Sequence, residues 1–290
     1  SYMPELPEVE VVRRSLQSFI KGLKIKKVSI FNRNLRYKIS KNFSKTIKNH
    51  KIISIERKSK FILIGLDNNK TILIHLGMTG KIFIVNNYLK KIFKTSFYYE
   101  NELSSKHNHL MIDFNKSTKL IYNDVRKFGF IKLISTNRIA QNKHLILLGP
   151  EPLTQKFNEK YFKKKLSKIK KKLKNLLMDQ KLVSGLGNIY VNEILHLSSI
   201  NPLKISSKLK NHQIKKIIKN TKKILLCAIK LGGSSIRDFK GIEGQNGYFQ
   251  QNFMVYNRDK EACKKEGCSG KIKKIYISNR STFYCLKCQK

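Results

Sequence analysis

The sequence predicts an α+β protein: an N-terminal antiparallel β-sandwich with a leading helix, followed by a helical domain that ends in a β-hairpin. Three stretches of hydrophobic patterning predict this fold. Apolar residues recur at helical spacing over residues 5–21, alternate with a period near two from residue 26 to residue 135, and return to helical spacing from residue 156. The 290 residues leave room for two domains and a sizeable core.

The leading helix is predicted to stop at Gly22, and short apolar, β-branched runs follow it. Turn-like segments such as Asp-Asn-Asn and Asn-Lys-Ser separate these runs, which favours antiparallel strands. The predicted strand runs are Lys26–Phe31, Ile52–Leu66, Thr71–Val85, His109–Phe114, Leu120–Val125 and Phe130–Ser135.

The C-terminal half is predicted to be mainly helical. Tyr161–Leu177 places apolar residues on one face with lysines around the rest, and further helices are expected at about 189–197 and 208–231. The predicted divisions are a sandwich domain at 1–135, a linker at 136–155, a helical domain at 156–232, and a loop with the cysteine hairpin at 233–290.

The formal net charge of +43 indicates a polyanionic partner, because only 18 acidic residues offset 61 basic ones. Lysine, isoleucine and asparagine are abundant throughout, so the charge favours nucleic acid without locating a site. No apolar run approaches the length of a membrane span, and no signal-peptide pattern opens the chain. A basic amphipathic segment at 163–174 leaves a membrane-surface role open. Otherwise we expect a cytoplasmic monomer.

Four cysteines follow the spacing of a structural metal site: Cys263, Cys268, Cys285 and Cys288. Two pairs of thiolates on short turns can surround one Zn²⁺ as a tetrahedron and leave no open position for metal catalysis. We therefore expect one structural zinc in a reducing compartment, and Cys227 as buried helix filler.

The dipeptide Pro4-Glu5 is a candidate active site. A chain that begins at Pro4 has a secondary amine there, and a terminal amine is less basic than lysine, so more of it is a free nucleophile near neutral pH. Glu5 could move protons at the same carbon. The alternative is an ordinary helix start, since proline and glutamate suit the first turn.

The segment Met178–Tyr190 contains two glycines between predicted helices. Gly185 and Gly187 permit a tight reversal, and Asn188 is predicted to cap the next helix. A helix start with free backbone N–H groups suits a DNA phosphate. An ordinary corner between helices is the alternative.

Two turns between strands carry residues suited to opening a duplex. In His75–Gly80, the flanking glycines can push Met78 outward as an apolar wedge, although core filler is the alternative. In Asn123–Gly129, Arg126 can pair with a base edge and Phe128 can fill a gap in the base stack. By itself, that turn also fits a charged hairpin.

These motifs occur together in one family and in the same order. The opening Met-Pro-Glu-Leu-Pro-Glu-Val-Glu, the His-Leu-Gly-Met-Thr-Gly and Asn-Asp-Val-Arg-Lys-Phe-Gly turns, Gly-Leu-Gly-Asn-Ile-Tyr and the four-cysteine module all belong to this set. From Pro4 to Lys290 the chain resembles the bacterial formamidopyrimidine-DNA glycosylases, the 8-oxoguanine DNA glycosylase and abasic-site lyase family. The resemblance implies a helix–two-turn–helix domain and a C-terminal zinc finger.

The resemblance implies base-excision repair of duplex DNA that contains oxidised purines or abasic sites. Pro4 would attack the sugar, expel the base and form a Schiff base, with Glu5 as its acid/base partner. Lys60 would assist near the lesion phosphate. Arg280 would grip that phosphate while the strand is cut by β,δ-elimination. The Pro-Glu-Leu-Pro-Glu form favours oxidised purines over pyrimidines.

The family also supplies expected DNA contacts. Met78, Arg126 and Phe128 would fill the space left by the flipped nucleotide, which offsets part of the cost of flipping. The other expected DNA-binding residues are His75, His107, Lys174 and Asn188. Glu8 and Glu193 fit structural and catalytic roles equally, and the segment 241–249 resembles a loop that closes over the extruded base.

Two non-catalytic alternatives stay open. If Ser1-Tyr2-Met3 stay attached, the Pro4 nitrogen is an amide, and the chain would be a lesion-sensing DNA-binding protein. Charge and cysteines alone also fit a basic RNA-associated zinc-ribbon protein.

Overall fold

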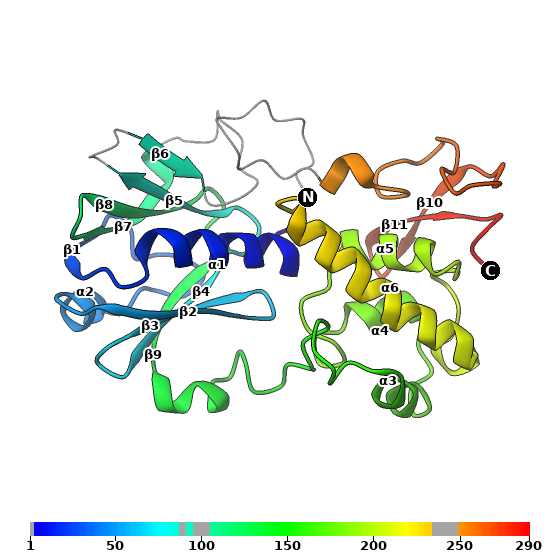
Figure 1. Cartoon of the computed structure of the whole chain (residues 1–290), viewed down its shortest axis with the longest axis horizontal. Coiled ribbons are helices and arrows are strands. Elements are labelled where there is room, and N and C mark those ends of the chain that lie inside the picture. Colours follow the sequence, from blue (N-terminus) through cyan, green and yellow to red (C-terminus); the bar gives the residue numbers. More distant parts are fainter. Residues whose placement is uncertain (1–2, 87–90, 95–104, 234–248) are drawn as a thin grey trace. The chain divides into compact units, whose positions relative to one another are not determined.

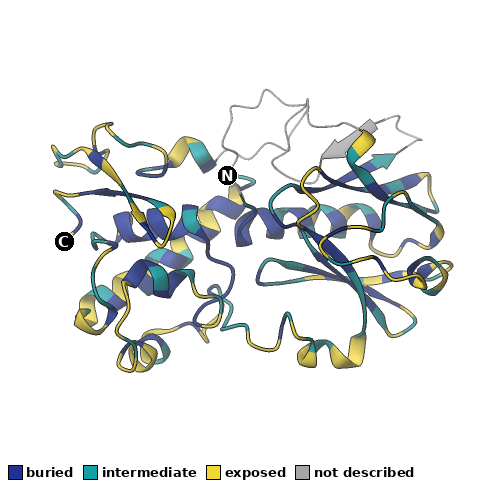
Figure 2. Cartoon of the chain, turned by 180° about the vertical axis from the view of Figure 1, so that it is seen from behind, coloured by how far each residue is buried: buried dark blue, intermediate teal, exposed yellow. Residues whose placement is uncertain are grey.

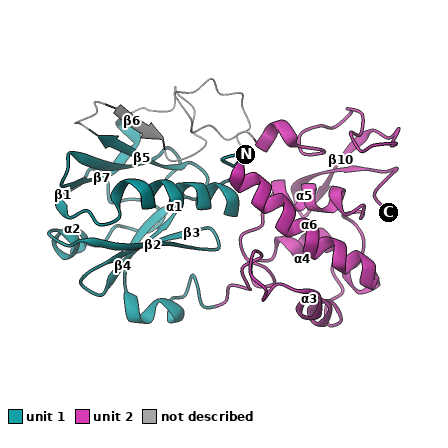
Figure 3. Cartoon of the chain, viewed as in Figure 1, with its two compact units in different colours: residues 1–146, 231–248 teal, residues 147–230, 249–290 magenta. Residues whose placement is uncertain are grey.

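The computed structural model describes residues 3–86, 91–94, 105–233 and 249–290. The chain forms two compact units (Figure 3). Unit 1 comprises Ser1–Ile146 with Leu231–Tyr248, and unit 2 comprises Leu147–Lys230 with Phe249–Lys290. The boundary between the units falls after Ile146, inside the expected linker at 136–155. The expected base-capping loop at 241–249 lies outside the described residues except for Phe249.

Unit 1 contains two antiparallel sheets and the leading helix α1 (Leu6–Ile20), so the predicted fold class is confirmed (Figure 1). The first sheet has the strand order β1-β7-β8-β5-β6, and the second has the order β2-β3-β4-β9. The strands are β1 (Ile25–Ile30), β2 (Ile52–Lys58), β3 (Phe61–Leu66), β4 (Lys70–His75), β5 (Gly80–Asn86), β6 (Lys91–Lys94), β7 (Asn108–Phe114), β8 (Thr118–Asp124) and β9 (Phe130–Ser135). The short helices are α2 (Phe43–Ile47), η2 (Ser105–His107) and η3 (Thr136–Gln141).

One hydrophobic core joins both sheets to the apolar face of α1. Val9 and Leu16 of α1 have no exposed surface, and they belong to the same cluster as Ile64 of the second sheet and Ile112 of the first. Figure 2 shows the buried residues along α1 and the strands in dark blue. Burial of this face fixes α1, and therefore its N-terminal end, against the sandwich.

Two of the predicted strand runs are each broken in the middle. The run Ile52–Leu66 is the hairpin of β2 and β3, in which Lys58 pairs with Phe61 and Ser59 has a positive φ of 55°. The run Thr71–Val85 is divided into β4 and β5 at the predicted turn His75–Gly80. Sequence periodicity missed the first break because Lys58-Ser59-Lys60 carries none of the usual glycine or asparagine turn signals.

Unit 2 contains four α-helices and a two-stranded hairpin among its described residues. The helices are α3 (Glu159–Leu166), α4 (Leu173–Met178), α5 (Asn188–Leu197) and α6 (Asn211–Lys230), with the short turns η4 (Ser206–Lys208) and η5 (Phe249–Asn252). The hairpin strands are β10 (Ile272–Ile277) and β11 (Arg280–Cys285). No helix in the described ranges is both long enough and apolar enough to cross a membrane.

The single helix predicted over Tyr161–Leu177 is wrong, because the structure divides it into α3 and α4. The backbone between them pairs with a distant segment instead. Lys172 forms a bridge with Ile205, and the Leu173 N–H donates a 2.8 Å hydrogen bond to the Lys204 carbonyl. Tertiary hydrogen bonding therefore overrides local helical periodicity here.

Candidate active site and nucleic-acid interface

Pro4 and Glu5 lie at the start of α1, where a reciprocal capping arrangement fixes them. Glu5 is the N-cap and is only 2% exposed, and its backbone N–H donates a 3.0 Å hydrogen bond to Oε1 of Glu8. The Glu5 side chain in turn accepts from the Glu8 backbone. Glu8, which is fully buried, therefore has a structural role, while Pro4 and Glu5 stay adjacent at a rigid helix end.

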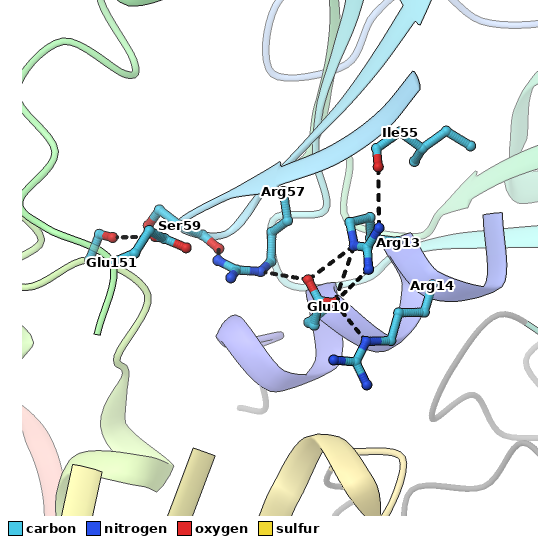
Figure 4. A network of polar contacts seen from close by, with 8 residues as sticks. Glu10, Arg13, Arg14, Ile55, Arg57, Ser59 and Glu151 are labelled. Carbon is cyan, nitrogen blue, oxygen red and sulfur yellow. Dashed lines mark hydrogen bonds and ion pairs between the residues drawn. The ribbon is translucent and has the colours of Figure 1, made fainter. Parts of the chain in front are cut away.

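An ion-pair network ties α1 to the turn that carries Lys60 (Figure 4). Glu10 of α1 pairs with Arg57 of β2 at 3.0 Å, and Arg57 also donates a 3.0 Å hydrogen bond to the Ser59 carbonyl. Burial alone would raise the pKa of Glu10, but hydrogen bonds from Arg13 and Arg14 and nearby positive charges lower it. The network therefore links the helix that carries Pro4 and Glu5 at its start to the turn that carries Lys60, both within unit 1.

His75, at the end of β4, is a neutral imidazole near pH 7. Burial, followed by the positive charges of Lys60, Arg36 and His144, lowers the pKa of His75 to about 4. Its Nδ1 accepts a 3.1 Å hydrogen bond from the Gly77 N–H. In a neutral ring this leaves the proton on Nε2, which can donate to an anionic oxygen.

The structure brings together the three predicted wedge residues. The Arg126 guanidinium lies 3.4 Å from Sδ of Met78 and stacks 4.5 Å from the centre of the Phe128 ring. Arg126 is exposed, Phe128 is 44% exposed, and Met78 is partly exposed. Two turns that are distant in sequence thus present one mixed apolar and cationic tip.

Close backbone packing holds these two turns against each other. Gly77 has a φ of +61°, and a Cβ at this position would lie 2.5 Å from the Gly129 nitrogen. Only glycine fits such a conformation and approach. The glycine therefore sets how near the Met78 turn comes to the Phe128 turn.

Asp124 organises the wedge, although sequence analysis did not select it. Its carboxylate is fully buried and accepts hydrogen bonds from the Thr79 and Tyr122 hydroxyls and from the backbone N–H groups of Lys127 and Gly129. An aspartate that precedes a turn and bonds its backbone is a recognisable sequence signal. The carboxylate is tied to both turns at once.

His107 lies in a groove beside the wedge. The groove has a volume of about 850 Å³, and its lining includes Lys106, His107, Lys127, and the exposed apolar residues Phe31 and Val125. Such a mixture of cationic and apolar side chains suits a DNA strand. His107 is thus on the same unit and beside the same turn as Arg126.

In unit 2, Lys174 is buried against the cysteine hairpin. Lys174 is only 1% exposed, and its Nζ donates to Oγ1 of Thr282 at 2.6 Å and to the Ser281 carbonyl at 3.4 Å. Burial, followed by the charge of Arg280, lowers the pKa of Lys174 to about 8. The structure therefore places two of the predicted DNA-contacting cations close together.

Arg280 follows a tight hairpin turn and is exposed. Ser278 and Asn279 both have positive φ, at 49° and 62°, and Ile277 pairs with Arg280 across the turn. Two central residues with positive φ match the twist of an antiparallel hairpin. The turn thus presents Arg280 at the first position of β11.

The prediction that the Asn188 side chain caps α5 is wrong. Gly187 is the N-cap, and Nδ2 of Asn188 instead donates a 2.9 Å hydrogen bond to the Ser281 carbonyl on the hairpin. The preceding loop is braced by Gln180, which accepts from the Gly185 N–H and donates to the Leu186 carbonyl. Lys174 and Asn188 therefore converge on the same carbonyl beside Arg280.

Glu193 of α5 has a structural role. It is 3% exposed, and its carboxylate accepts hydrogen bonds of 2.6–3.0 Å from the backbone N–H groups of Met254, Val255 and Tyr256. Burial raises the pKa of Glu193, although these hydrogen bonds oppose the rise. The carboxylate fixes the segment that leads into the cysteine hairpin.

The four cysteines fit a tetrahedral metal ion. The sulfurs of Cys263 and Cys288 lie 3.8 Å apart, those of Cys268 and Cys285 lie 3.7 Å apart, and all four lie within 4.8 Å of one another. Sulfurs bonded to one Zn²⁺ at about 2.3 Å lie about 3.8 Å apart in a tetrahedron. His196 places its Nε2 3.4 Å from the Cys263 sulfur, where it can support the site from outside.

The sequence and the fold match a known family. The N-terminal domain model of formamidopyrimidine-DNA glycosylase matches residues 3–131, and the H2TH domain model of the same family matches residues 148–240. The chain belongs to the formamidopyrimidine-DNA glycosylase family.

Relatives that match over the full length of the chain support the same family. A formamidopyrimidine-DNA glycosylase of Rickettsia bellii is 41% identical over 289 residues, with coverage of 99% of this chain and 100% of the relative. A mutant of the Lactococcus lactis enzyme in complex with DNA containing Fapy-dG has a TM-score of 0.86 at 36% identity, with coverage of 99% and 100%. The Lactococcus lactis enzyme with DNA containing an abasic site has a TM-score of 0.85 at the same identity, with coverage of 99% of each chain.

Proposed function

We propose that this glycosylase removes oxidised purines, namely 8-oxoguanine and formamidopyrimidines, from duplex DNA and then cleaves the abasic strand. The observation that carries the proposal is the capped helix start at which Pro4 directly precedes the buried residue Glu5. Membership of the family and the relatives bound to Fapy-dG and abasic DNA support the substrate class.

Pro4 is the proposed nucleophile in a chain that begins at that residue. The lone pair of its nitrogen forms a bond to C1′, the glycosidic bond breaks, and the base leaves with that bond's electrons. The nitrogen gives its N–H proton to the departing base. The C1′–O4′ bond then breaks, O4′ takes a proton from Glu5, and the nitrogen lone pair forms the C=N bond of an iminium Schiff base. Because Pro4 and Glu5 are consecutive residues at a rigid helix end, their amine and carboxyl group would act at the same sugar carbon.

The iminium accounts for the proposed lyase step. It withdraws electrons from the sugar, so the 2′ proton becomes acidic, and loss of that proton expels the 3′ phosphate by β-elimination. Loss of the 4′ proton, made acidic by the conjugated iminium, then expels the 5′ phosphate by δ-elimination. Lys60 and Arg280 are the proposed cations at the lesion phosphate, and each can stabilise the charge that develops there. The Glu10–Arg57 network supports this role for Lys60 because it holds the Lys60 turn against α1.

Met78, Arg126 and Phe128 form the proposed wedge. Extrusion of a base costs a few kcal/mol, and the clustered tip can fill the gap and contact the orphaned base. The proposed phosphate contacts are His75, His107, Lys174 and Asn188. Neutral His75 supports this role because its Nε2–H is a donor, and Lys174 supports it as a cation that shares a hairpin carbonyl with Asn188.

We also propose that Cys263, Cys268, Cys285 and Cys288 hold one structural Zn²⁺. A bound zinc would cross-link the two ends of the hairpin and so fix Arg280. Because reduced thiolates are needed, the proposal includes a reducing cytoplasm as the place of action.

Borohydride trapping tests the proposal directly. A form of the chain that begins at Pro4 is incubated with an 8-oxoguanine duplex and reduced, and the reduced iminium gives a covalent protein–DNA adduct on a denaturing gel. A form in which Ser1-Tyr2-Met3 precede Pro4 is the matched control, because its Pro4 nitrogen is an amide. Absence of an adduct from the Pro4 form would contradict the catalytic proposal.

A further inference from the structure

One aromatic ring in unit 1 is surrounded by cations that the proposed function does not use. Lys132 Nζ lies 3.8 Å from the centre of the Tyr37 ring, Lys143 Nζ lies at 5.1 Å, and the Arg36 guanidinium lies at 5.6 Å. With His144, whose ring centre lies 5.5 Å from that of Tyr37, they form the Tyr37 cluster. Cation–π contact holds each cation at the ring, although the cations repel one another.

The cluster contains only positive or neutral groups. Lys132 Nζ lies 2.9 Å from Nε2 of His144, so the ammonium donates to a neutral imidazole. Burial and the surrounding positive charges lower the pKa of both groups, that of His144 to about 4. Among the described residues, no carboxylate pairs with Arg36, Lys132 or Lys143. An anion is therefore the missing partner.

The cluster is continuous with the catalytic half of unit 1. The Tyr37 ring meets the edge of Phe130 at a centroid distance of 5.1 Å, and Phe130 stacks on His75 at 5.5 Å. His75 is in turn close enough to Lys60 for the Lys60 charge to lower its pKa. Strands β4 and β9, which are paired, carry His75 and Lys132. The cations of the cluster thus lie next to the proposed phosphate contacts His75 and Lys60.

We propose that the Tyr37 cluster binds a backbone phosphate of the DNA that flanks the lesion, in addition to the phosphate contacts assigned above. The cationic groups of the cluster can only donate hydrogen bonds, and phosphodiester oxygens can only accept them. The proposal rests on the proposed function only in taking duplex DNA as the ligand. Its tests use undamaged duplex, so their outcome is separate from that of borohydride trapping.

The salt dependence of binding tests the cluster. Affinity for an undamaged duplex is measured against salt concentration for Lys132→Ala with Lys143→Ala, and for Lys26→Ala with Lys27→Ala on the exposed part of β1. Both variants lose the same charge. Loss of one phosphate contact lowers the slope of log K against log salt by about 0.9. We expect this loss for the cluster variant and a smaller one for the control; equal losses would overturn the proposal.

The ring itself provides a second test, because its proposed role is to position the cations. Tyr37→Phe keeps the ring and should keep the wild-type salt slope. Tyr37→Leu should lower that slope by about as much as the double lysine variant does. A thermal unfolding midpoint within a few degrees of wild type shows that each variant is folded. A Tyr37→Leu variant with an unchanged slope would contradict the proposal.

Protection of the lysines from acetylation reports occupancy without substitution. The whole protein is treated with an amine-acetylating reagent with and without undamaged duplex, and each lysine is quantified by mass spectrometry. We expect DNA to lower acetylation of Lys132 and Lys143 at least severalfold more than that of Lys26 and Lys27. Equal protection of both lysine pairs would show that DNA contacts the cluster only through the general positive charge of the protein. That result would overturn the proposal.

Discussion

The hydroxyl of Thr79 donates a 2.5 Å hydrogen bond to the buried carboxylate of Asp124, and this contact joins the two turns of the wedge. Thr79 also accepts a 2.9 Å hydrogen bond from the Arg126 backbone N–H. One hydroxyl therefore connects the Met78 turn both to the base of the second turn and to its arginine. The tip depends on a buried polar network rather than on apolar packing alone.

Substitution of Asp124 is predicted to impair opening of the duplex more than the chemistry. In Asp124→Asn, the amide nitrogen cannot accept the hydrogen bonds that one carboxylate oxygen now accepts, and unsatisfied buried donors cost about 1–3 kcal/mol. We expect excision of 8-oxoguanine from duplex DNA to slow by about 10- to 100-fold, as such a cost implies for a step that requires the wedge. Cleavage of an abasic site in single-stranded DNA, which has no orphaned base, should change little.

Asp113→Asn is the matched control for this prediction. Asp113 lies on the neighbouring strand β7 and forms a 3.5 Å ion pair with partly exposed Lys119, so the same charge change should leave duplex excision near wild type. A parallel loss on single-stranded and duplex substrates in Asp124→Asn would show that Asp124 supports the fold generally rather than the wedge.

Glu10→Gln is predicted to destabilise unit 1 in a pH-dependent way. The pKa of folded Glu10 lies below its ordinary value of 4.5, so the carboxylate contributes stability above pH 4.5 that is lost as the pH falls through the folded pKa. Loss of the hydrogen bonds from Arg13, Arg14 and Arg57 should lower the free energy of unfolding by about 1–3 kcal/mol at pH 7. Denaturant unfolding at pH 7 and pH 3.5 checks this.

The exposed residue Glu56 on β2 supplies the comparison, because Glu56→Gln removes the same charge outside the network. Its unfolding free energy should stay within about 0.5 kcal/mol of wild type at both pH values. A Glu10→Gln deficit that is equally large at pH 3.5 would exclude the ion pairs as its cause.

Sequence periodicity predicted the sandwich and most helices because each buried face repeats within its own element. It failed where a distant backbone decides the local structure. Residues 167–172 continue the helical spacing, but Lys172 pairs with Ile205 and the helix is broken. The run Ile52–Leu66 similarly concealed a turn at Ser59, whose positive φ has no sequence signal there.

The same limit applies to the site residues. Pro4, Lys60 and Arg280 were selected from motifs, which identify residue types without their partners. The role of Asp124 depends on Thr79, which is 45 positions away, and the Asn188 side chain bonds to Ser281, which is 93 positions away. A capping role was predicted for Asn188 because the local sequence offers one, and a tertiary acceptor took its place.

Loss of one cysteine ligand is predicted to remove the metal and weaken DNA binding together. Cys268→Ser replaces one of four thiolates, so zinc measured by atomic spectroscopy should fall from about one per chain to well below one. Because the hairpin carries Arg280, affinity for an abasic-site duplex should fall as well. The prediction that Cys227 is buried is wrong, because its side chain on α6 is exposed, so Cys227→Ser, outside the cluster, should retain zinc and affinity. Full zinc occupancy in Cys268→Ser would contradict the four-thiolate site.

Lys174 is predicted to make DNA affinity and protein stability respond oppositely to pH. Its pKa of about 8 means that the ammonium is present below pH 8 and is lost above it, so affinity for an abasic-site duplex should fall from pH 7 to pH 9. Between this pKa and the ordinary value of 10.5, the unfolded chain binds the proton more tightly, so the free energy of unfolding should rise with pH. Lys174→Met should remove both responses, whereas Lys223→Met, at an exposed position on α6, should keep both. Affinity and stability that fall together in the wild type would contradict a buried Lys174 ammonium as a DNA contact.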